Sequence, residues 1–220
     1  MKKAILAESF LVLLAISIPF FYLATVYNML PPTVPIHFDI KGNPNGYSGK
    51  QSLWVFLCIL AALSFGTYQL IINLQKIDPK RAAGQSSKLL RKIAITVLVI
   101  MTVINLMIVY AAKGGPMNIS GFMLQFLGLV FLVIGNFMHS IKPNYFVGFR
   151  LPWTMEDPEN WRKTHQVVSK VWVTGGLLIF TGAFLLPQQA AYIFFVAMLS
   201  LMVIMPAVYS YNYFKKNKKS

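Results

Sequence analysis

Acidic side chains are scarce in this sequence of 220 residues, in which six Asp and Glu stand against twenty Lys and Arg. Charged residues make up only 12% of the chain, about half the share of an average soluble domain, whereas 56% of the residues are hydrophobic. The single cysteine, Cys58, lies within an apolar run, which excludes a disulfide framework and a cysteine-based metal site. These shortages argue against an ordinary soluble domain and favour an integral membrane protein.

The common catalytic motifs are also missing, including H-E-x-x-H, G-x-S-x-G, the P-loop and the dinucleotide-binding pattern. His139 and His165 flank three acids, Glu156, Asp157 and Glu159, but the regular spacing of metal ligands is absent. We therefore expect no enzymatic activity, no catalytic residue, no metal site and no cofactor.

Six apolar segments are long enough to cross a bilayer as helices, which takes roughly 20 residues each. They lie near residues 4–28, 51–74, 93–112, 119–138, 168–187 and 190–212. The opening Met-Lys-Lys resembles the start of a signal peptide, but the apolar run is too long for one, so we expect a retained helix. The predicted fold class is an all-α integral membrane protein with six transmembrane helices.

Basic residues are distributed unevenly over the loops between these segments. The N-terminus, residues 75–92, residues 139–170 and the tail together hold 17 Lys and Arg, whereas the opposite loops hold Lys41, Lys50 and Lys113. Because cytoplasmic loops carry the excess of Lys and Arg, both termini are predicted to be cytoplasmic. The same bias explains the net charge of +14, so we expect no direct nucleic-acid binding.

Residues 31–50, PPTVPIHFDIKGNPNGYSGK, are then predicted to form an ordered extracytoplasmic loop. Its prolines hold the chain extended after the first helix, and the alternation over residues 36–41 predicts a strand. Asn45 and Gly46 suit a turn with positive φ. The loop is either a cap folded onto the helix ends or a lid that contacts a ligand.

In the strand model, His37 points outward while Phe38 packs on the helix ends, and Gly42 and Gly46 occupy turns. The candidate ligand-binding residues of this loop are His37, Phe38, Asp39, Gly42 and Lys50.

Residues 139–166 are predicted to form an ordered cytoplasmic loop. Asp157-Pro158-Glu159 is a favourable helix start, with a capping side chain and proline at the first helical position. If that helix continues into the fifth span, one face carries Trp161, His165, Val168 and Trp172. The loop is either a membrane-surface segment with aromatic anchors or a docking surface for a partner.

The two loops together resemble the signatures of the bacterial SdpI family. The stretch LPPTVPIHFDIKGNPNGYSGK is similar to that family's extracytoplasmic signature, P-x-H-[FW]-x-x-x-G-x-P-[DN]. The stretch KPNYFVGFRLPWTMEDPENWRKTHQ is similar to its second signature, N-x-x-x-G-[IF]-R-x-P-W-T followed by W-x-K-T-H. Both occur in the expected order and on the expected sides of the membrane.

The resemblance implies a multi-pass protein of the bacterial cell membrane that gives immunity against a secreted peptide toxin. It also implies signal transduction, in which the protein sequesters a cytoplasmic transcriptional repressor. The implied partners are therefore the lipid bilayer, the toxin and the repressor. The partner-binding residues carried over from the second signature are Asn144, Gly148, Arg150, Pro152, Trp153, Trp161, Lys163 and His165.

We accordingly divide the chain into residues 1–92, a helix pair with its outer loop and a basic linker, and residues 93–220, an SdpI-like four-helix region with a basic tail. Two alternative functions stay open. A small-molecule transporter usually has an inverted repeat, whereas the long loops here follow the first and fourth spans and do not repeat. A membrane-embedded enzyme would need acids, bases or a metal at one interface, for which residues 139–166 are the candidate.

Overall fold

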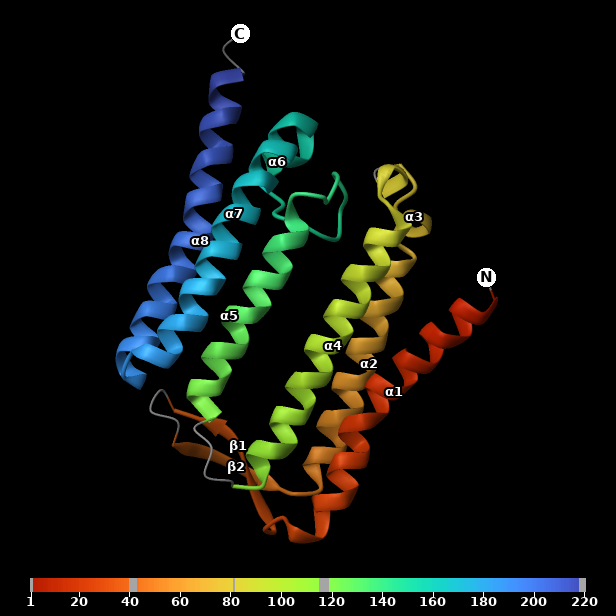
Figure 1. Cartoon of the computed structure of the whole chain (residues 1–220), viewed down its shortest axis with the longest axis vertical. Coiled ribbons are helices and arrows are strands. Elements are labelled where there is room, and N and C mark those ends of the chain that lie inside the picture. Colours follow the sequence, from red (N-terminus) through yellow and green to blue (C-terminus); the bar gives the residue numbers. More distant parts are fainter. Residues whose placement is uncertain (1, 40–42, 81, 115–118, 218–220) are drawn as a thin grey trace. The chain divides into compact units, whose positions relative to one another are not determined.

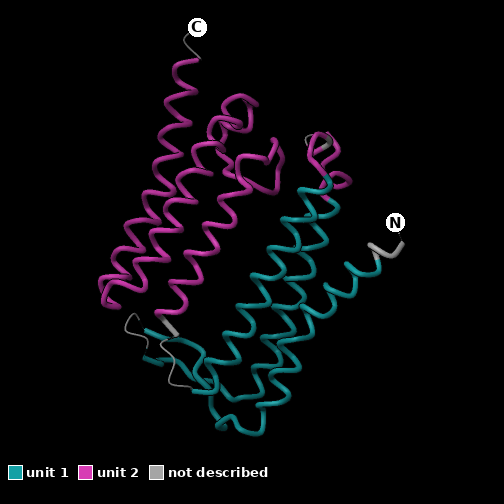
Figure 2. Tube along the Cα trace, viewed as in Figure 1, with its two compact units in different colours: residues 1–73, 87–119 teal, residues 74–86, 120–220 magenta. Residues whose placement is uncertain are grey.

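The computed structural model describes residues 2–39, 43–80, 82–114 and 119–217. The chain separates into two compact units, shown in different colours in Figure 2. Unit 1 holds residues 1–73 and 87–119, and unit 2 holds residues 74–86 and 120–220. The third long helix thus belongs with the first two, and these boundaries differ from the expected division between residues 92 and 93.

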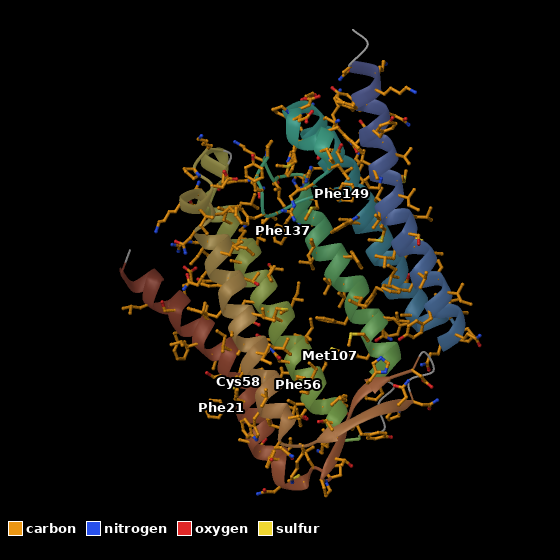
Figure 3. The ribbon with its side chains drawn as sticks, turned by 180° about the vertical axis from the view of Figure 1, so that it is seen from behind. Phe21, Phe56, Cys58, Met107, Phe137 and Phe149 are labelled. Carbon is orange, nitrogen blue, oxygen red and sulfur yellow. The ribbon has the colours of Figure 1, made fainter. Side chains whose placement is uncertain are left out.

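Three long helices form the body of unit 1 (Figure 1). They are α1 (Lys2–Val26), α2 (Ser52–Ile72) and α4 (Ser87–Ala112), and each contacts the other two. A short 3-10 turn, η1 (Tyr27–Met29), follows α1. Because a bilayer offers no hydrogen-bond partners, a spanning segment must satisfy its backbone internally, and a helix does so. Large apolar side chains point outward, such as Phe21, which is 70% exposed (Figure 3).

A polar cluster joins the three helices of unit 1. Glu8 of α1 accepts a hydrogen bond from the Tyr68 hydroxyl of α2 at 2.7 Å, and its second oxygen lies 2.5 Å from Nη1 of Arg91 on α4. An ionised carboxylate in an apolar environment is costly unless it is paired. The cluster therefore gives Glu8 two partners and links α1 to both neighbours.

An antiparallel hairpin of β1 (Thr33–Phe38) and β2 (Pro44–Gly49) connects α1 to α2. The strand begins earlier than the alternation indicates and ends at Phe38. The prediction that Asn45 and Gly46 form the turn is wrong, because both lie in β2, with Gly46 opposite His37. A Cβ on Gly46 would lie 3.0 Å from the Cβ of His37, so close strand approach, rather than positive φ, favours glycine here.

The hairpin is anchored by Val34, which is fully buried. Val34 belongs to a hydrophobic cluster with side chains of all three helices, including Leu23, Leu53 and Val109. Phe38, expected to pack on the helix ends, is only half-buried. The main apolar contact of the hairpin is therefore made near its base.

Unit 2 consists of three long helices and three short elements (Figure 1). The long helices are α5 (Ile119–Met138), α7 (Pro158–Leu185) and α8 (Gln188–Asn217). The short elements are α3 (Leu74–Ile77), the 3-10 turn η2 (Ala82–Gly84) and α6 (Pro152–Glu156).

Glycines bring α5 and α7 into backbone contact. A Cβ on Gly176 of α7 would lie 2.5 Å from the backbone nitrogen of Leu132 and 2.6 Å from the carbonyl oxygen of Gly128, both on α5. Small residues allow this approach, and such contacts are a main source of helix association in lipid. On the other side of α7, Nε1 of Trp172 donates to the carbonyl of Met202 on α8 at 3.0 Å.

Within the described residues, six helices are long and apolar enough to cross a membrane, as the sequence predicts. The third and fifth begin earlier than expected, at Ser87 and Pro158. The predicted helix start is confirmed at α7, where Oδ1 of Asp157 accepts from the N–H of Glu159 at 2.8 Å. The polar first turns of α7 therefore extend the fifth span into the loop before it.

Candidate functional site

Asn144 organises the loop that leads from α5 to α6. Its side chain is fully buried, and Nδ2 donates to the carbonyls of Lys142 and Val147 at 2.9 and 2.8 Å. Oδ1 accepts from the backbone N–H groups of Phe146 and Val147 at 2.8 and 2.7 Å. An amide side chain has two donors and two acceptor positions, so the loop uses all four. Asn144 therefore holds the loop in a single shape.

His165 and Trp161, one turn apart on α7, receive the next part of the loop. The two rings stack with centroids 4.1 Å apart, and both side chains are 1% exposed. Nδ1 of His165 faces the Trp161 carbonyl at 2.9 Å, and Nε2 faces the N–H of Phe149 at 2.9 Å. A carbonyl needs a donor and an N–H needs an acceptor, which assigns the neutral ring with its proton on Nδ1.

Gly148 makes this arrangement possible. Its φ of 123° lies in the region that favours glycine, and a Cβ there would lie 2.6 Å from Nε2 of His165 and 2.9 Å from the ring of Trp161. Trp161 in turn donates from Nε1 to the carbonyl of Ile141 at 2.7 Å. The glycine, the histidine and the tryptophan of the second signature thus form one packed unit.

The threonines of the signature are structural as well. Thr154 is fully buried, and its Oγ1 accepts from the N–H of Leu151 at 2.9 Å, which completes the start of α6. On α7, Oγ1 of Thr164 donates to Oδ1 of Asn160 at 3.0 Å, and Nδ2 of Asn160 donates to the carbonyl of Ser210 on α8 at 3.1 Å. Thr154 and Thr164 both lie within the second signature, but neither is among the predicted partner-binding residues.

Trp153 connects α6 to α8. Its Nε1 donates to Oγ of Ser210 at 2.7 Å, and its ring stacks on Phe214 with centroids 6.3 Å apart. The side chain is half-buried, so one edge stays accessible. Trp153 is therefore both an anchor to α8 and part of the surface.

The exposed part of the predicted partner site consists of Arg150, Pro152 and one edge of Trp153. Nη1 of Arg150 donates to the carbonyl of Tyr145. Lys163, whose side chain is 37% exposed, lies above the ring of Tyr213, with Nζ 4.8 Å from its centroid. These four side chains are accessible to a partner. The side chains of Asn144, Trp161 and His165 are buried, and Gly148 lies against the rings of Trp161 and His165.

Residues 74–86 brace the same loop. Nε2 of Gln85 donates to the carbonyl of Lys142 at 2.7 Å, and Nε2 of Gln75 donates to the carbonyl of Gln85 at 2.6 Å. Oδ2 of Asp78 accepts from the N–H of Tyr145 at 3.2 Å. These three residues are not among the predicted site residues, because nothing in a polar linker marks which side chains reach a distant loop.

The hairpin places its candidate residues in different roles. His37 is exposed, and its Nδ1 lies 2.5 Å from Oδ1 of Asn45 on the neighbouring strand. Asp39 accepts from the N–H of Asn43 at 2.8 Å and from its side-chain amide at 3.3 Å, which closes the turn. Gly42 lies outside the described residues.

Lys50 lies at the base of the hairpin. Its Nζ donates to the carbonyls of Tyr27 and Leu30 at 3.1 and 3.3 Å and lies 4.7 Å from the centroid of the Tyr27 ring. A cation beside the last carbonyls of a helix stabilises its C-terminus. Lys50 therefore holds the chain where it leaves α1. Among the described candidate ligand-binding residues, His37 is the most accessible.

No group of three His, Cys, Asp or Glu side chains that could hold a metal ion occurs in the part of the chain that the structure describes. The two histidines of residues 139–166 also lie in different surroundings, since His139 is exposed and His165 is buried with both ring nitrogens engaged.

Comparison with known proteins agrees with the motifs. Residues 140–210 match the model of the SdpI/YfhL protein family, and residues 14–61 match a family described as a domain of unknown function. The chain is 24% identical over 216 residues to the immunity protein SdpI of Bacillus subtilis (strain 168), covering 98% of each protein. No solved structure matches the chain. The chain is thus similar to the SdpI family in residues 140–210 and to an immunity protein of that name along almost its whole length.

Proposed function

We propose that this chain is a membrane immunity protein that protects its cell against a peptide toxin arriving from outside. The observation that carries the proposal is the similarity over 98% of both chains to a protein named for immunity. The six apolar helices support a location in the membrane, where such a toxin would act. No catalytic step is part of this function.

The proposed orientation puts both termini in the cytoplasm and the hairpin outside the cell. Its support is the distribution of basic residues, with 17 Lys and Arg on one set of loops and three on the other. In this orientation the hairpin is the first ordered part of the chain that an external peptide meets.

Within the hairpin, His37 is proposed to contact the toxin. Lys50 and Asp39 hold the base and the turn, and Val34 anchors the strand in the core. His37 instead lies on the exposed face, positioned by its contact with Asn45. A side chain that is ordered yet accessible suits recognition, because little conformational freedom is lost on binding.

The cytoplasmic side is proposed to dock a transcriptional repressor through Arg150, Pro152, Trp153 and Lys163. Arginine and tryptophan dominate the energetics of protein interfaces. The buried residues of the signature then act as the frame of this surface. Asn144 and His165 hold the backbone of Val147 and Phe149, which leads to Arg150, and Trp161 bonds to the carbonyl of Ile141 at the start of the loop.

Deletion of the gene tests the immunity function. The deletion strain, treated with concentrated culture medium of the wild-type strain, should survive less well than the wild type, and a plasmid copy should restore survival. His37→Ala should restore less protection at normal membrane abundance, whereas Thr33→Ala, on an exposed position of the same strand, should protect fully. Equal survival of deletion and wild-type strains would contradict the immunity function.

The docking surface needs a separate readout. Arg150→Gln should change transcription of the neighbouring genes while abundance and toxin survival persist, and Arg162→Gln is the matched control. Arg162 is also exposed, but it pairs with Glu159 at 2.6 Å and is not among the proposed contacts. If both variants change transcription equally, general charge rather than this surface is responsible.

A further inference from the structure

A surface cavity of unit 2 lies where residues 74–86 meet the loop after α5. It has a volume of about 450 Å³. It is lined by Ile77, Asp78, Pro79, Lys80, Tyr145 and Phe146. We call this cavity the interfacial pocket, and none of its lining residues is among the proposed docking residues.

The walls of the interfacial pocket are held together by hydrogen bonds between the two segments. Asp78 accepts from the backbone N–H of Tyr145, and Gln85 donates to the carbonyl of Lys142. In each bond a side chain pairs with a backbone group, and the two bonded residues are 57 or 67 positions apart in the sequence. The pocket is therefore a built feature of unit 2 rather than a gap between independent loops.

The exposed lining is strongly apolar. Ile77 is 50% exposed, Tyr145 52% and Phe146 39%, and Pro79 in the same lining is also exposed. Exposed apolar clusters of this kind mark contact with a membrane or a partner. Residues 77–80 follow the end of the α2 span at Ile72 within eight residues, and residues 145–146 follow the end of the α5 span at Met138 within eight. If these helices span a bilayer, the lining lies just beyond their ends, where lipid headgroups are found.

Positive charge borders the apolar lining. Lys80 belongs to the lining and is exposed. Arg150 is also exposed, and its guanidinium donates one hydrogen bond to the carbonyl of Tyr145. This bond uses one of the five N–H donors of the guanidinium. The acid in the lining, Asp78, is buried and engaged with the loop backbone. The accessible charge is thus positive, which suits a phosphate group.

We propose that the interfacial pocket binds the headgroup of an anionic phospholipid. Lys80 and Arg150 contact the phosphate, and Ile77, Tyr145 and Phe146 pack against the glycerol and the first part of the acyl chains. Basic pockets at the cytoplasmic ends of membrane helices bind anionic lipid headgroups in this way. A lipid is favoured over a cytoplasmic protein because exposed apolar and exposed basic side chains lie together within eight residues of the ends of two apolar helices. The inference is independent of the immunity function.

Native mass spectrometry of the full chain in detergent tests the proposal, with phosphatidylglycerol and phosphatidylcholine added in equal amounts. The wild type should retain phosphatidylglycerol preferentially. Lys80→Gln should weaken its retention about fivefold, which corresponds to ~1 kcal/mol, the usual contribution of one basic residue near an anionic surface. Lys88→Gln is the matched control, since Lys88 is an exposed lysine of unit 1 that does not line the pocket.

A second variant tests the apolar lining. Tyr145→Ala with Phe146→Ala should also weaken retention severalfold, and it keeps the backbone bonds of these residues to Asp78, Arg150 and Asn144. Equal retention of the two lipids, or equal effects of Lys80→Gln and Lys88→Gln, would overturn the proposal. Full competition by glycerophosphoglycerol, which lacks acyl chains, would identify a site for soluble phosphate instead. Unchanged lipid retention in both pocket variants would also overturn the proposal, and the pocket would then be a contact site for a protein.

Discussion

Gly148 shows how the absence of a side chain determines the conformation of the loop between α5 and α6. Its φ of 123° and its distance to the rings of His165 and Trp161 leave no room for a Cβ. We expect Gly148→Ala to lower the free energy of unfolding by roughly 2–6 kcal/mol, from backbone strain and from overpacking against the two rings. Thermal denaturation in detergent and membrane abundance by immunoblot measure the effect.

The control for this variant is Gly66→Ala. Within the described residues, no heavy atom lies within 4 Å of a Cβ built at Gly66 of α2 beyond the helix's own backbone, so alanine there should be neutral or slightly stabilising. If Gly148→Ala and Gly66→Ala have the same melting temperature, the loop accommodates a Cβ at Gly148, and its packed conformation is not required for stability.

A second residue-scale prediction concerns Asn144. Asn144→Asp keeps an acceptor for the N–H groups of Phe146 and Val147 but loses the donor to the carbonyls of Lys142 and Val147. Because a buried charge and two unpaired carbonyls result, we expect a loss of roughly 2–5 kcal/mol of stability. A melting temperature equal to that of the wild type would show that the loop is not held by this side chain.

At the scale of elements, the contact between α5 and α7 depends on which glycine faces which neighbour. Gly176 meets the backbone of Leu132 and Gly128, which cannot move away without shifting a helix, whereas the adjacent Gly175 meets the flexible side chain of Met202. Gly176→Ala should therefore destabilise unit 2 by about 1–3 kcal/mol, and Gly175→Ala by less than about 1 kcal/mol. Melting curves of both variants in the same detergent compare them, and equal losses would contradict backbone contact as the cause.

The hairpin is the other element whose stability can be tested separately. Val34→Ala removes two methyl groups from a fully buried position, so we expect a loss of about 2 kcal/mol. Ile36→Ala on the same strand is the control, since Ile36 is 47% exposed and should cost little. Protease sensitivity of the hairpin in purified protein reports the effect, and equal sensitivity of the two variants would mean that Val34 does not anchor it.

For the whole molecule, the prediction is the orientation in the membrane. Tyr47→Cys in a Cys58→Ala background should react with an impermeant maleimide added to intact cells, since Tyr47 is 61% exposed in the hairpin. Ser86→Cys, also exposed, should react only after permeabilisation, because the basic loops favour the cytoplasm. Labelling of Ser86→Cys alone in intact cells would invert the topology.

The sequence alone determined the six long apolar helices, the start of α7 and the resemblance to the SdpI family. Each of these rests on local information: a run of apolar residues long enough for a bilayer, a capping side chain before a proline, and motif letters at fixed spacing. The shared face of Trp161, His165 and Val168 was predictable for the same reason, since helical periodicity places them together, and all three are buried.

Tertiary structure alone decided which residues of the candidate site are enclosed and which are accessible. Trp161 and Arg150 look equally suited to an interface, yet Trp161 bonds to Ile141 beneath the loop and Arg150 lies on its surface. The hydrogen bonds of Asp78 with Tyr145 and of Trp153 with Ser210 join residues 67 and 57 positions apart, and no local pattern encodes such pairs. Burial is a property of contacts between distant segments, so it appears only when the chain is folded.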